Sequence, residues 1–304
     1  MTDVILDEFL RVGVIQTTVD NLAAWSSGLC MSFVEEERAV SEIQQHLAAL
    51  NLEDPKPHIV LLPEVAVPLG FLPRLRRIAA KMNSIIIAGL DFEELASAIP
   101  KAARNRAAVI IPNRWGLTHS SKTTLRYVGK TYPSYEEERH LNQCGYEFHP
   151  VPEIWIFEGG KFGRFGVVIC FDLLDLERVS IYRMQVQHLF VLAYNKDATT
   201  FDHAAEALSR MIYCNVVICN TGHHGGSIAV SPYKRPERRM IYRHSGIGLS
   251  TSQTICLPVA SLHSAQTESW PPGKEREFKA LPPGAKAVHH HAVHNAPLSS
   301  TVGA

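Results

Sequence analysis

Short, nearly continuous hydrophobic runs recur along the chain, and Gly, Pro or polar residues flank them. Strands that are covered on both faces show this pattern, because neither face meets water. We therefore predict strands at these runs, which are residues 12–15, 59–62, 85–88, 107–111, 166–170, 189–192 and 216–219.

Between several of these runs, hydrophobic residues recur with the period of a helix. Each such set forms one apolar stripe that can pack on a sheet. The stripes are Val40, Ile43, Leu47 and Leu50, then Phe71, Leu75, Ile78 and Met82, and later Ala204, Leu208 and Met211. Two later helices are expected near 176–187 and 202–213.

The order of elements is β-α-β-α-β-β over residues 12–111 and again over about 165–230. Each half is an α/β layer whose sheet needs cover on its second face. We therefore predict an α/β protein with a four-layer α-β-β-α sandwich, built from two βαβαββ halves. A single doubly wound sheet is the alternative, because periodicity does not say how the halves dock.

Two segments fall outside this plan. Residues 112–150 form a long polar connection between the halves, and connections of this length are usually functional or disordered. From about 263 the chain is rich in Pro, Ala and His, with few periodic hydrophobic residues. We expect a domain over 1–262 and a tail over 263–304 that is partly disordered or wraps a partner. The run His289–His291 lacks a framework of carboxylates or cysteines, so a solvated tract is favoured over a metal site.

Composition narrows the classes of function. Of 304 residues, 46% are hydrophobic, and 30 Lys and Arg balance 30 Asp and Glu. A zero net charge gives no support for nucleic-acid or anionic-membrane binding, so neither partner is expected. The sequence has neither a signal-peptide pattern at its start nor an apolar run near the ~20 residues that span a bilayer, so we expect a cytoplasmic protein.

Cys170 is the most informative cysteine, because it stands where a predicted strand meets a loop. Reactive side chains are often presented at the carboxyl end of a strand in α/β layers. The competing interpretation is a buried structural cysteine, the class to which we assign Cys214, Cys219 and Cys256. Glu64 holds the equivalent place in the first half, directly after Pro63. Lys130 lies in the long connection, where a single lysine is usually solvated.

Three short motifs occur in a distinctive order: Leu-Pro-Glu at 62–64, Gly-Lys at 129–130, and Gly-Val-Val-Ile-Cys-Phe-Asp at 166–172. Together they resemble the nitrilase or carbon-nitrogen hydrolase superfamily. The stretches 12–16, 105–113 and 210–220 are similar to other parts of that family, so the resemblance covers most of the chain.

The resemblance implies a role for each motif residue. In that family the glutamate is the general base, the lysine stabilises the oxyanion and the cysteine is the nucleophile, which correspond to Glu64, Lys130 and Cys170. A second glutamate often follows the lysine. Glu138 is the best match, with Glu136 and Glu137 as alternatives. Asn195 stands where family members place residues that contact substrate.

The same three residue types satisfy the chemistry of acyl transfer, which needs a thiolate, a proton carrier and a group that stabilises the oxyanion. Cys-Phe-Asp at 170–172 is closer to the Cys-Tyr-Asp of amidase-like branches than to the Cys-Trp-Glu of true nitrilases. We therefore predict a hydrolase of a small amide or carbamoyl compound that works through a thioester, without cofactor or metal.

Two further expectations follow from the resemblance and its limits. The family implies a homodimer or larger homo-oligomer, formed through the helices after Cys170 and around 202–213. Residues 173–177 depart from the Arg-Phe-Pro-Glu that often follows the nucleophile in amidase-like branches. The alternative function is therefore a catalytically divergent interaction or regulatory module with this fold.

Overall fold

Two six-stranded sheets form the centre of the molecule. The computed structural model describes residues 5–26, 28–116, 121–268 and 276–285. The first sheet has the order β15-β1-β2-β3-β6-β7. Its strands are β1 (Phe9–Gln16), β2 (Ile59–Val67), β3 (Ile85–Leu90), β6 (Arg106–Pro112), β7 (Thr123–Gly129) and β15 (Thr251–Pro258).

The second sheet has the order β14-β13-β12-β11-β10-β9, and a small three-stranded sheet, β4-β5-β8, lies apart from both. The second sheet consists of β9 (Ile156–Glu158), β10 (Arg164–Ile169), β11 (His188–Ala193), β12 (Asn215–Asn220), β13 (Ser227–Val230) and β14 (Met240–His244). The small sheet consists of β4 (Glu93–Leu95), β5 (Ala102–Arg104) and β8 (Glu147–Phe148).

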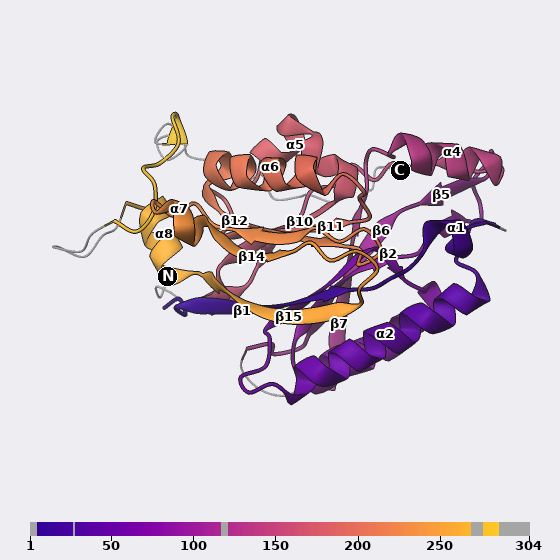
Figure 1. Ribbon diagram of the computed structural model, residues 1–304, viewed down its shortest axis with the longest axis horizontal. Coiled ribbons are helices and arrows are strands. Elements are labelled where there is room, and N and C mark those ends of the chain that lie inside the picture. Colours follow the sequence, from indigo (N-terminus) through magenta and orange to yellow (C-terminus); the bar gives the residue numbers. More distant parts are fainter. Residues whose placement is uncertain (1–4, 27, 117–120, 269–275, 286–304) are drawn as a thin grey trace, which may run out of the picture.

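Helices cover the outer faces of both large sheets. The α-helices are α1 (Asn21–Ala24), α2 (Phe33–Leu52), α3 (Leu72–Met82), α4 (Tyr135–Gln143), α5 (Leu176–Ser180), α6 (Ala198–Leu208), α7 (Pro236–Arg239) and α8 (Ala260–Gln266). Shorter turns are η1 (Leu69–Phe71), η2 (Gly160–Phe162), η3 (Cys170–Leu174) and a π-helical turn, Ser209–Tyr213. Figure 1 shows α2 below the first sheet and α5 and α6 above the second.

Alternation along the strands explains this layering. Successive side chains of a strand point to opposite faces. In β2, Leu61 belongs to the core between the sheets, which also contains Val167 and Phe190 of the second sheet. Its neighbour Leu62 packs with Ile43 of α2, on the outer face. The predicted α-β-β-α sandwich is therefore confirmed, and the single doubly wound sheet was wrong.

The long connection over 112–150 contains more structure than its polar composition indicated. It contributes β7, which pairs antiparallel with β6, and α4, which begins at a capping box formed by Ser134 and Glu137. Both sheets also gain edge strands that were not predicted, β15 beside β1 and β9 beside β10.

The two later helices differ from expectation in extent. The helix expected near 176–187 is α5 alone, Leu176–Ser180. Met184 has a φ of 59°, which a right-handed helix does not allow. The helix expected over 202–213 is α6, which begins at Ala198 and gives way to the π turn at Ser209.

The expected boundary at 262/263 falls inside α8. Part of the segment beyond it packs on the domain, because Phe278 is 2% exposed and forms an antiparallel bridge with Tyr233. Residues 286–304, including His289–His291, lie outside the described part of the chain. No helix in the described ranges combines the length and hydrophobicity needed to cross a bilayer.

Candidate active site

Glu64, Lys130 and Cys170 come together between the two large sheets. Lys130 and Cys170 follow strand ends as expected, whereas Glu64 lies within β2, where the pairing with β3 is irregular between Leu62 and Val67. Glu64 belongs to β2, Lys130 directly follows β7, and Cys170 directly follows β10. The packing beside Glu64 is tight. A Cβ on Gly89 of β3 would lie 2.2 Å from the Pro63 carbonyl oxygen, so only glycine fits at this position.

The backbone at Cys170 is unusual. Its φ is 44°, in the left-handed region that non-glycine residues rarely adopt, and the residue begins the 3-10 turn η3. Such conformations cluster at functional sites, because the surrounding structure must hold them in place. The Cys170 side chain is thus turned out of the strand at the point where the sheets meet.

A buried ionic network surrounds Lys130. Its ammonium Nζ lies 2.8 Å from Glu64 Oε1 and also forms an ion pair with Glu137 Oε2. Asn105 Nδ2 donates to both carboxylates, at 2.8 Å to Glu64 Oε1 and 2.8 Å to Glu137 Oε1. The side chains of Lys130, Glu64 and Glu137 are only 2%, 4% and 7% exposed.

Burial and charge set the protonation of this network. Burial alone would lower the pKa of Lys130, but Glu137 and Glu64 outweigh it and hold that pKa well above its usual value. The lysine is therefore an ammonium. Burial raises the pKa of Glu137, and the nearby Glu64 adds to this effect while Lys130 opposes it.

The Cys170 thiol lies within this field. Burial raises its pKa well above the usual value, the Glu64 carboxylate raises it further, and Lys130 counteracts part of the rise. The backbone N–H of Tyr194 lies near the sulfur as well and lowers the pKa of the thiol in part. At neutral pH the sulfur is thus a thiol with a carboxylate beside it, which is the arrangement of a nucleophile and its general base.

Neither the family models nor the curated proteins match this sequence. Similar solved structures do exist. A carbon-nitrogen hydrolase superfamily protein of Xanthomonas campestris, with an arsenic adduct in its active site, superposes with a TM-score of 0.61 at 15% identity, over 86% of this chain and 96% of that one.

Two further structures agree with the first. Nit3 of Saccharomyces cerevisiae, a member of branch 10 of the nitrilase superfamily, has a TM-score of 0.60 at 16% identity, over 90% of this chain and 98% of its own. An amidase from Nesterenkonia sp. has a TM-score of 0.57 at 13% identity, over 88% and 98%. The chain has the carbon-nitrogen hydrolase fold. At these identities the likeness establishes the fold alone.

On this fold, the structure places Glu137 rather than Glu138 beside Lys130. Glu138 lies on the exposed side of α4, whereas Glu137 is buried. Glu137 is the third residue of α4, where its carboxylate also accepts from the Ser134 N–H and completes the capping box. Glu137, one of the two alternatives to the preferred Glu138, is therefore the glutamate that pairs with Lys130.

Asn195 does not reach the network with its side chain. Its amide group closes a local turn with Asp197, donating to the Asp197 carbonyl and accepting from the Asp197 N–H. Its neighbour Tyr194 is the residue that reaches the site, because its backbone N–H donates to Glu64 Oε2 at 2.9 Å. A backbone donor of this kind leaves no mark in the sequence.

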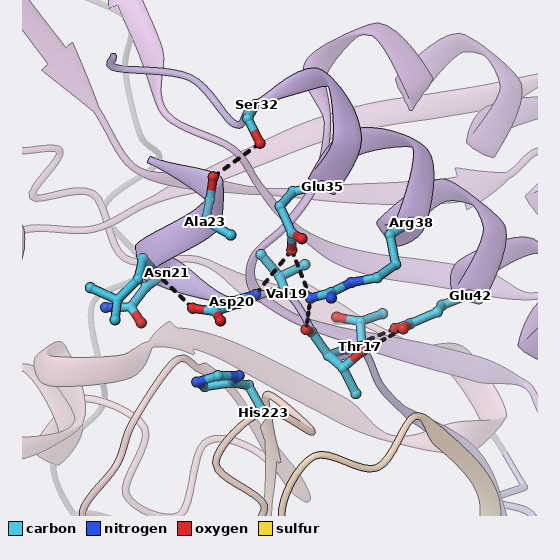
Figure 2. Close-up of polar contacts among 12 residues, drawn as sticks. Thr17, Val19, Asp20, Asn21, Ala23, Ser32, Glu35, Arg38, Glu42 and His223 are labelled. Carbon is cyan, nitrogen blue, oxygen red and sulfur yellow. Dashed lines mark hydrogen bonds and ion pairs between the residues drawn. The ribbon is translucent and has the colours of Figure 1, made fainter. Parts of the chain in front are cut away.

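Tyr194 is itself held by the loop after β1. Its hydroxyl donates to the Val19 carbonyl at 2.8 Å and accepts from the Asn21 N–H at 3.0 Å. Helix α2 fixes this loop in turn, as Figure 2 shows. Glu35 Oε2 accepts from the Asp20 N–H at 3.1 Å, and Arg38 pairs with Glu35 while donating to the Thr18 carbonyl.

Asp172 ties the η3 turn, which begins at Cys170, to the segment that follows Lys130. Its two carboxylate oxygens accept from the backbone N–H groups of Thr131 and Tyr132, each at 2.8 Å. Arg178 of α5 approaches Asp172 at 3.4 Å and donates to the Thr131 hydroxyl at 2.7 Å. The guanidinium that steadies this turn thus lies outside the divergent stretch 173–177.

The other cysteines lie in different surroundings. Cys214 is fully buried, and burial alone raises its pKa. Cys219 is buried as well and donates to the Ile15 carbonyl at 3.1 Å. Cys256 was expected to be buried but is exposed on β15. Within the described part of the chain, His, Cys, Asp and Glu side chains form no group of three or more suited to a metal ion.

Proposed function

We propose that this protein hydrolyses the C–N bond of a small amide through a thioester on Cys170. The observation that carries the proposal is that Cys170 is buried between the two sheets, where the ion pair of Glu64 and Lys130 acts on its thiol. Burying three ionisable groups together is costly, and such clusters are typical of sites that need perturbed protonation.

In the first half-reaction, Glu64 takes the thiol proton while the Cys170 sulfur bonds to the amide carbon. Among the described residues, Lys130 Nζ gives two of its three N–H donors to Glu64 and Glu137, which leaves the third for the developing oxyanion. Collapse of the tetrahedral intermediate breaks the C–N bond. Glu64 returns its proton to the leaving nitrogen, and ammonia or an amine departs.

In the second half-reaction, Glu64 removes a proton from water, and the water oxygen bonds to the thioester carbon. The C–S bond then breaks, the proton passes to the sulfur, and a carboxylic acid is released. Glu137 and Asn105 act as positioning residues in this scheme, because they hold Lys130 and Glu64 without contacting the reacting carbon.

Small aliphatic amides are the substrates to test first. The structural neighbours include an amidase from Nesterenkonia sp., a variant of which carries the acetamide moiety of fluoroacetamide on its active-site cysteine. A cysteine-to-alanine mutant of the same amidase was solved with butyramide. Fluoroacetamide would alkylate Cys170 in the same way, with the sulfur displacing fluoride.

The direct test is ammonia release from acetamide, propionamide and butyramide. We expect Cys170→Ala to lower kcat/KM by about 10³-fold or more, because the nucleophile is lost. Cys214→Ala is the matched control, since it removes a buried thiol of the same sheet and should leave kcat within a few-fold. Full turnover by Cys170→Ala would overturn the thiol mechanism, whereas no turnover by the wild type on any amide would favour the divergent module.

The homo-oligomer and the cytoplasmic location expected from sequence belong to the same proposal. Analytical ultracentrifugation of the full chain tests the first. A sedimenting species with the mass of one chain at micromolar concentration would contradict it.

A further inference from the structure

A cavity of about 400 Å³ lies on the helix-covered side of the second sheet. Its walls share no residue with the Glu64–Cys170 site. Three stretches that are distant in sequence enclose it: residues 203–210 at the end of α6, residues 230–233 after β13, and Lys279 of the C-terminal segment, with Arg239 of α7 beside them. Its volume lies within the range of small-molecule sites.

The walls are held together by direct contacts. The Lys279 N–H donates to the Pro232 carbonyl at 3.1 Å, and the Tyr213 hydroxyl donates to the Lys279 carbonyl. The Ser231 N–H donates to the Arg239 carbonyl at 2.9 Å. Because these contacts fix the walls, the cavity is preformed.

Positive charge dominates the lining. Arg210, Arg239 and Lys279 each come from a different wall, and Glu206 is the one acid among the described lining residues. Glu206 lies 3.5 Å from Arg239 and is 60% exposed, so this pair is weak. The cavity therefore carries an excess of two positive charges.

Two buried polar atoms in the lining lack a hydrogen-bond partner among the described residues, Arg210 Nη1 and Ser231 Oγ. Ser231 is only 2% exposed. A guanidinium nitrogen can only donate, and a buried donor is normally satisfied. Its missing partner is thus an acceptor, and the Ser231 hydroxyl can donate to the same group.

A π-helical turn places Arg210 at the wall of the cavity. Ser209–Tyr213 interrupts the α-helical path of α6, and the Ser209 hydroxyl donates to the Cys214 carbonyl at 2.8 Å. Such wide turns are frequent at functional sites. Here the turn carries Arg210, whose guanidinium carbon lies 5.8 Å from the centre of the Tyr213 ring.

We propose that this cavity binds a phosphate group, either free or as the monoester of a small molecule. A phosphate monoester carries about −1.5 to −2 charges at pH 7 and presents three acceptor oxygens. These match the two excess positive charges and the two unpartnered donors. A carboxylate matches less well, because it brings a single charge.

The test is isothermal titration calorimetry of the full chain at pH 7 and fixed ionic strength, with chloride as the balancing anion. Inorganic phosphate, methyl phosphate and acetate are titrated separately. We expect phosphate to bind saturably with one site per chain and acetate to bind more weakly. Tighter binding of methyl phosphate than of inorganic phosphate would identify the monoester as the ligand class, and the reverse order would identify the free ion.

Variants locate the site. Arg210→Gln should weaken phosphate binding about tenfold or more, because a charge-assisted hydrogen bond is lost. Arg77→Gln makes the same change at an exposed residue of α3, and it should leave the Kd for phosphate within about twofold. Should Arg210→Gln fail to fold by circular dichroism, Lys279→Gln tests the opposite wall in its place, with the same expected weakening.

Three results would overturn the proposal. The first is wild-type protein that shows no saturable heat with millimolar phosphate. The second is equal weakening by Arg210→Gln and Arg77→Gln, which would indicate general screening of charge. The third is acetate that binds as tightly as phosphate, which would exclude phosphate as the recognised group.

Discussion

Buried polar side chains lie at both ends of the central strands of the second sheet, and the two ends differ in charge. At the carboxyl end, Cys170 lies beside the ionic network of Glu64, Lys130 and Glu137. At the amino end, His188 and Asn215 begin β11 and β12 and use neutral groups only. There His188 Nε2 lies 3.1 Å from the Phe162 carbonyl oxygen, and Asn215 Nδ2 lies 3.0 Å from His188 Nδ1.

The contrast between the two ends shows that buried polar residues can be accommodated in this fold without charge. At the amino end, burial lowers the pKa of His188 to about 3, so the ring stays neutral and its two nitrogens have neutral partners. At the carboxyl end, two carboxylates and an ammonium are kept in the interior. Buried ion pairs contribute little net stability compared with apolar residues of similar volume. Their presence beside a thiol therefore supports a catalytic role for this end.

The largest expected change is in kcat, when the charged Glu64 at the carboxyl end of the sheet is replaced by a neutral side chain like those at the amino end. Glu64→Gln replaces the carboxylate with a neutral amide of similar volume, so the protein should fold but lack its general base. We expect kcat to fall about 10² to 10⁴-fold on an amide that the wild type hydrolyses. Ammonia release under saturating substrate measures this change.

Gln187→Leu is the control at the amino end. It removes the contact of Gln187 Nε2 with Gln266 Oε1 at 2.6 Å, and should lower the melting temperature while leaving kcat within a few-fold. Wild-type turnover by Glu64→Gln would mean that the charged groups at the carboxyl end, like the neutral groups at the amino end, have no catalytic role.

The next effect concerns stability and pH. The folded-state pKa of His188, about 3, lies below its usual value of 6.5, so the unfolded chain takes up a proton first as pH falls. The contribution of His188 to the free energy of unfolding is complete above pH 6.5. It should decrease by about 1.4 kcal/mol per pH unit as the pH falls from 6.5 towards 3.

Urea unfolding between pH 7 and 4 tests this prediction. The difference in free energy of unfolding between the wild type and His188→Gln should shrink as pH falls. A constant difference for His188→Gln would mean that the buried ring is not held neutral.

The smallest effect comes from Tyr194, which links the carboxyl end to the loop after β1. Tyr194→Phe removes the hydroxyl that holds Val19 and Asn21 but keeps the backbone N–H that donates to Glu64. The two lost hydrogen bonds are worth about 1 kcal/mol each, so kcat should decrease about fivefold if half of that loss falls on the transition state.

Steady-state kinetics distinguish a role of Tyr194 in positioning Glu64 from a role in binding substrate. We expect kcat to decrease while KM stays within about twofold, and Tyr127→Phe on β7 should change neither constant. A change in KM alone would place Tyr194 in substrate binding instead of in the support of Glu64.

Much of the fold could be predicted from the sequence, because hydrophobic runs identify strands covered on both faces. The edge strands could not. β15 pairs with β1 from more than 230 residues away, Gln16 with Thr251 among others, and no local pattern records such a pairing. In the long connection, helix α4 was not predicted, because most of its residues are polar. Its capping box of Ser134 and Glu137 is nevertheless visible in the sequence.

The candidate site divides in the same way. Strand ends alone drew attention to Cys170 and Glu64, whereas Lys130 was recognised only through the family resemblance. Glu137 could have been preferred to Glu138, because Glu137 and the buried Leu141 are four residues apart and share a helix face. The backbone N–H of Tyr194 and the contacts of the loop after β1 depend on the folded chain and have no sequence signal.

In the proposed mechanism, the substrate acyl group is bonded transiently to the sulfur of Cys170, at the charged end of the second sheet. Acid quenching of the full chain during turnover of butyramide, followed by intact-mass spectrometry and peptide mapping, tests it directly. We expect a butyryl group on Cys170 in the wild type and none in Cys170→Ala, with Cys214 unmodified in both. Turnover of butyramide without acyl enzyme in rapid-quench samples, or acylation at Cys214, would contradict it.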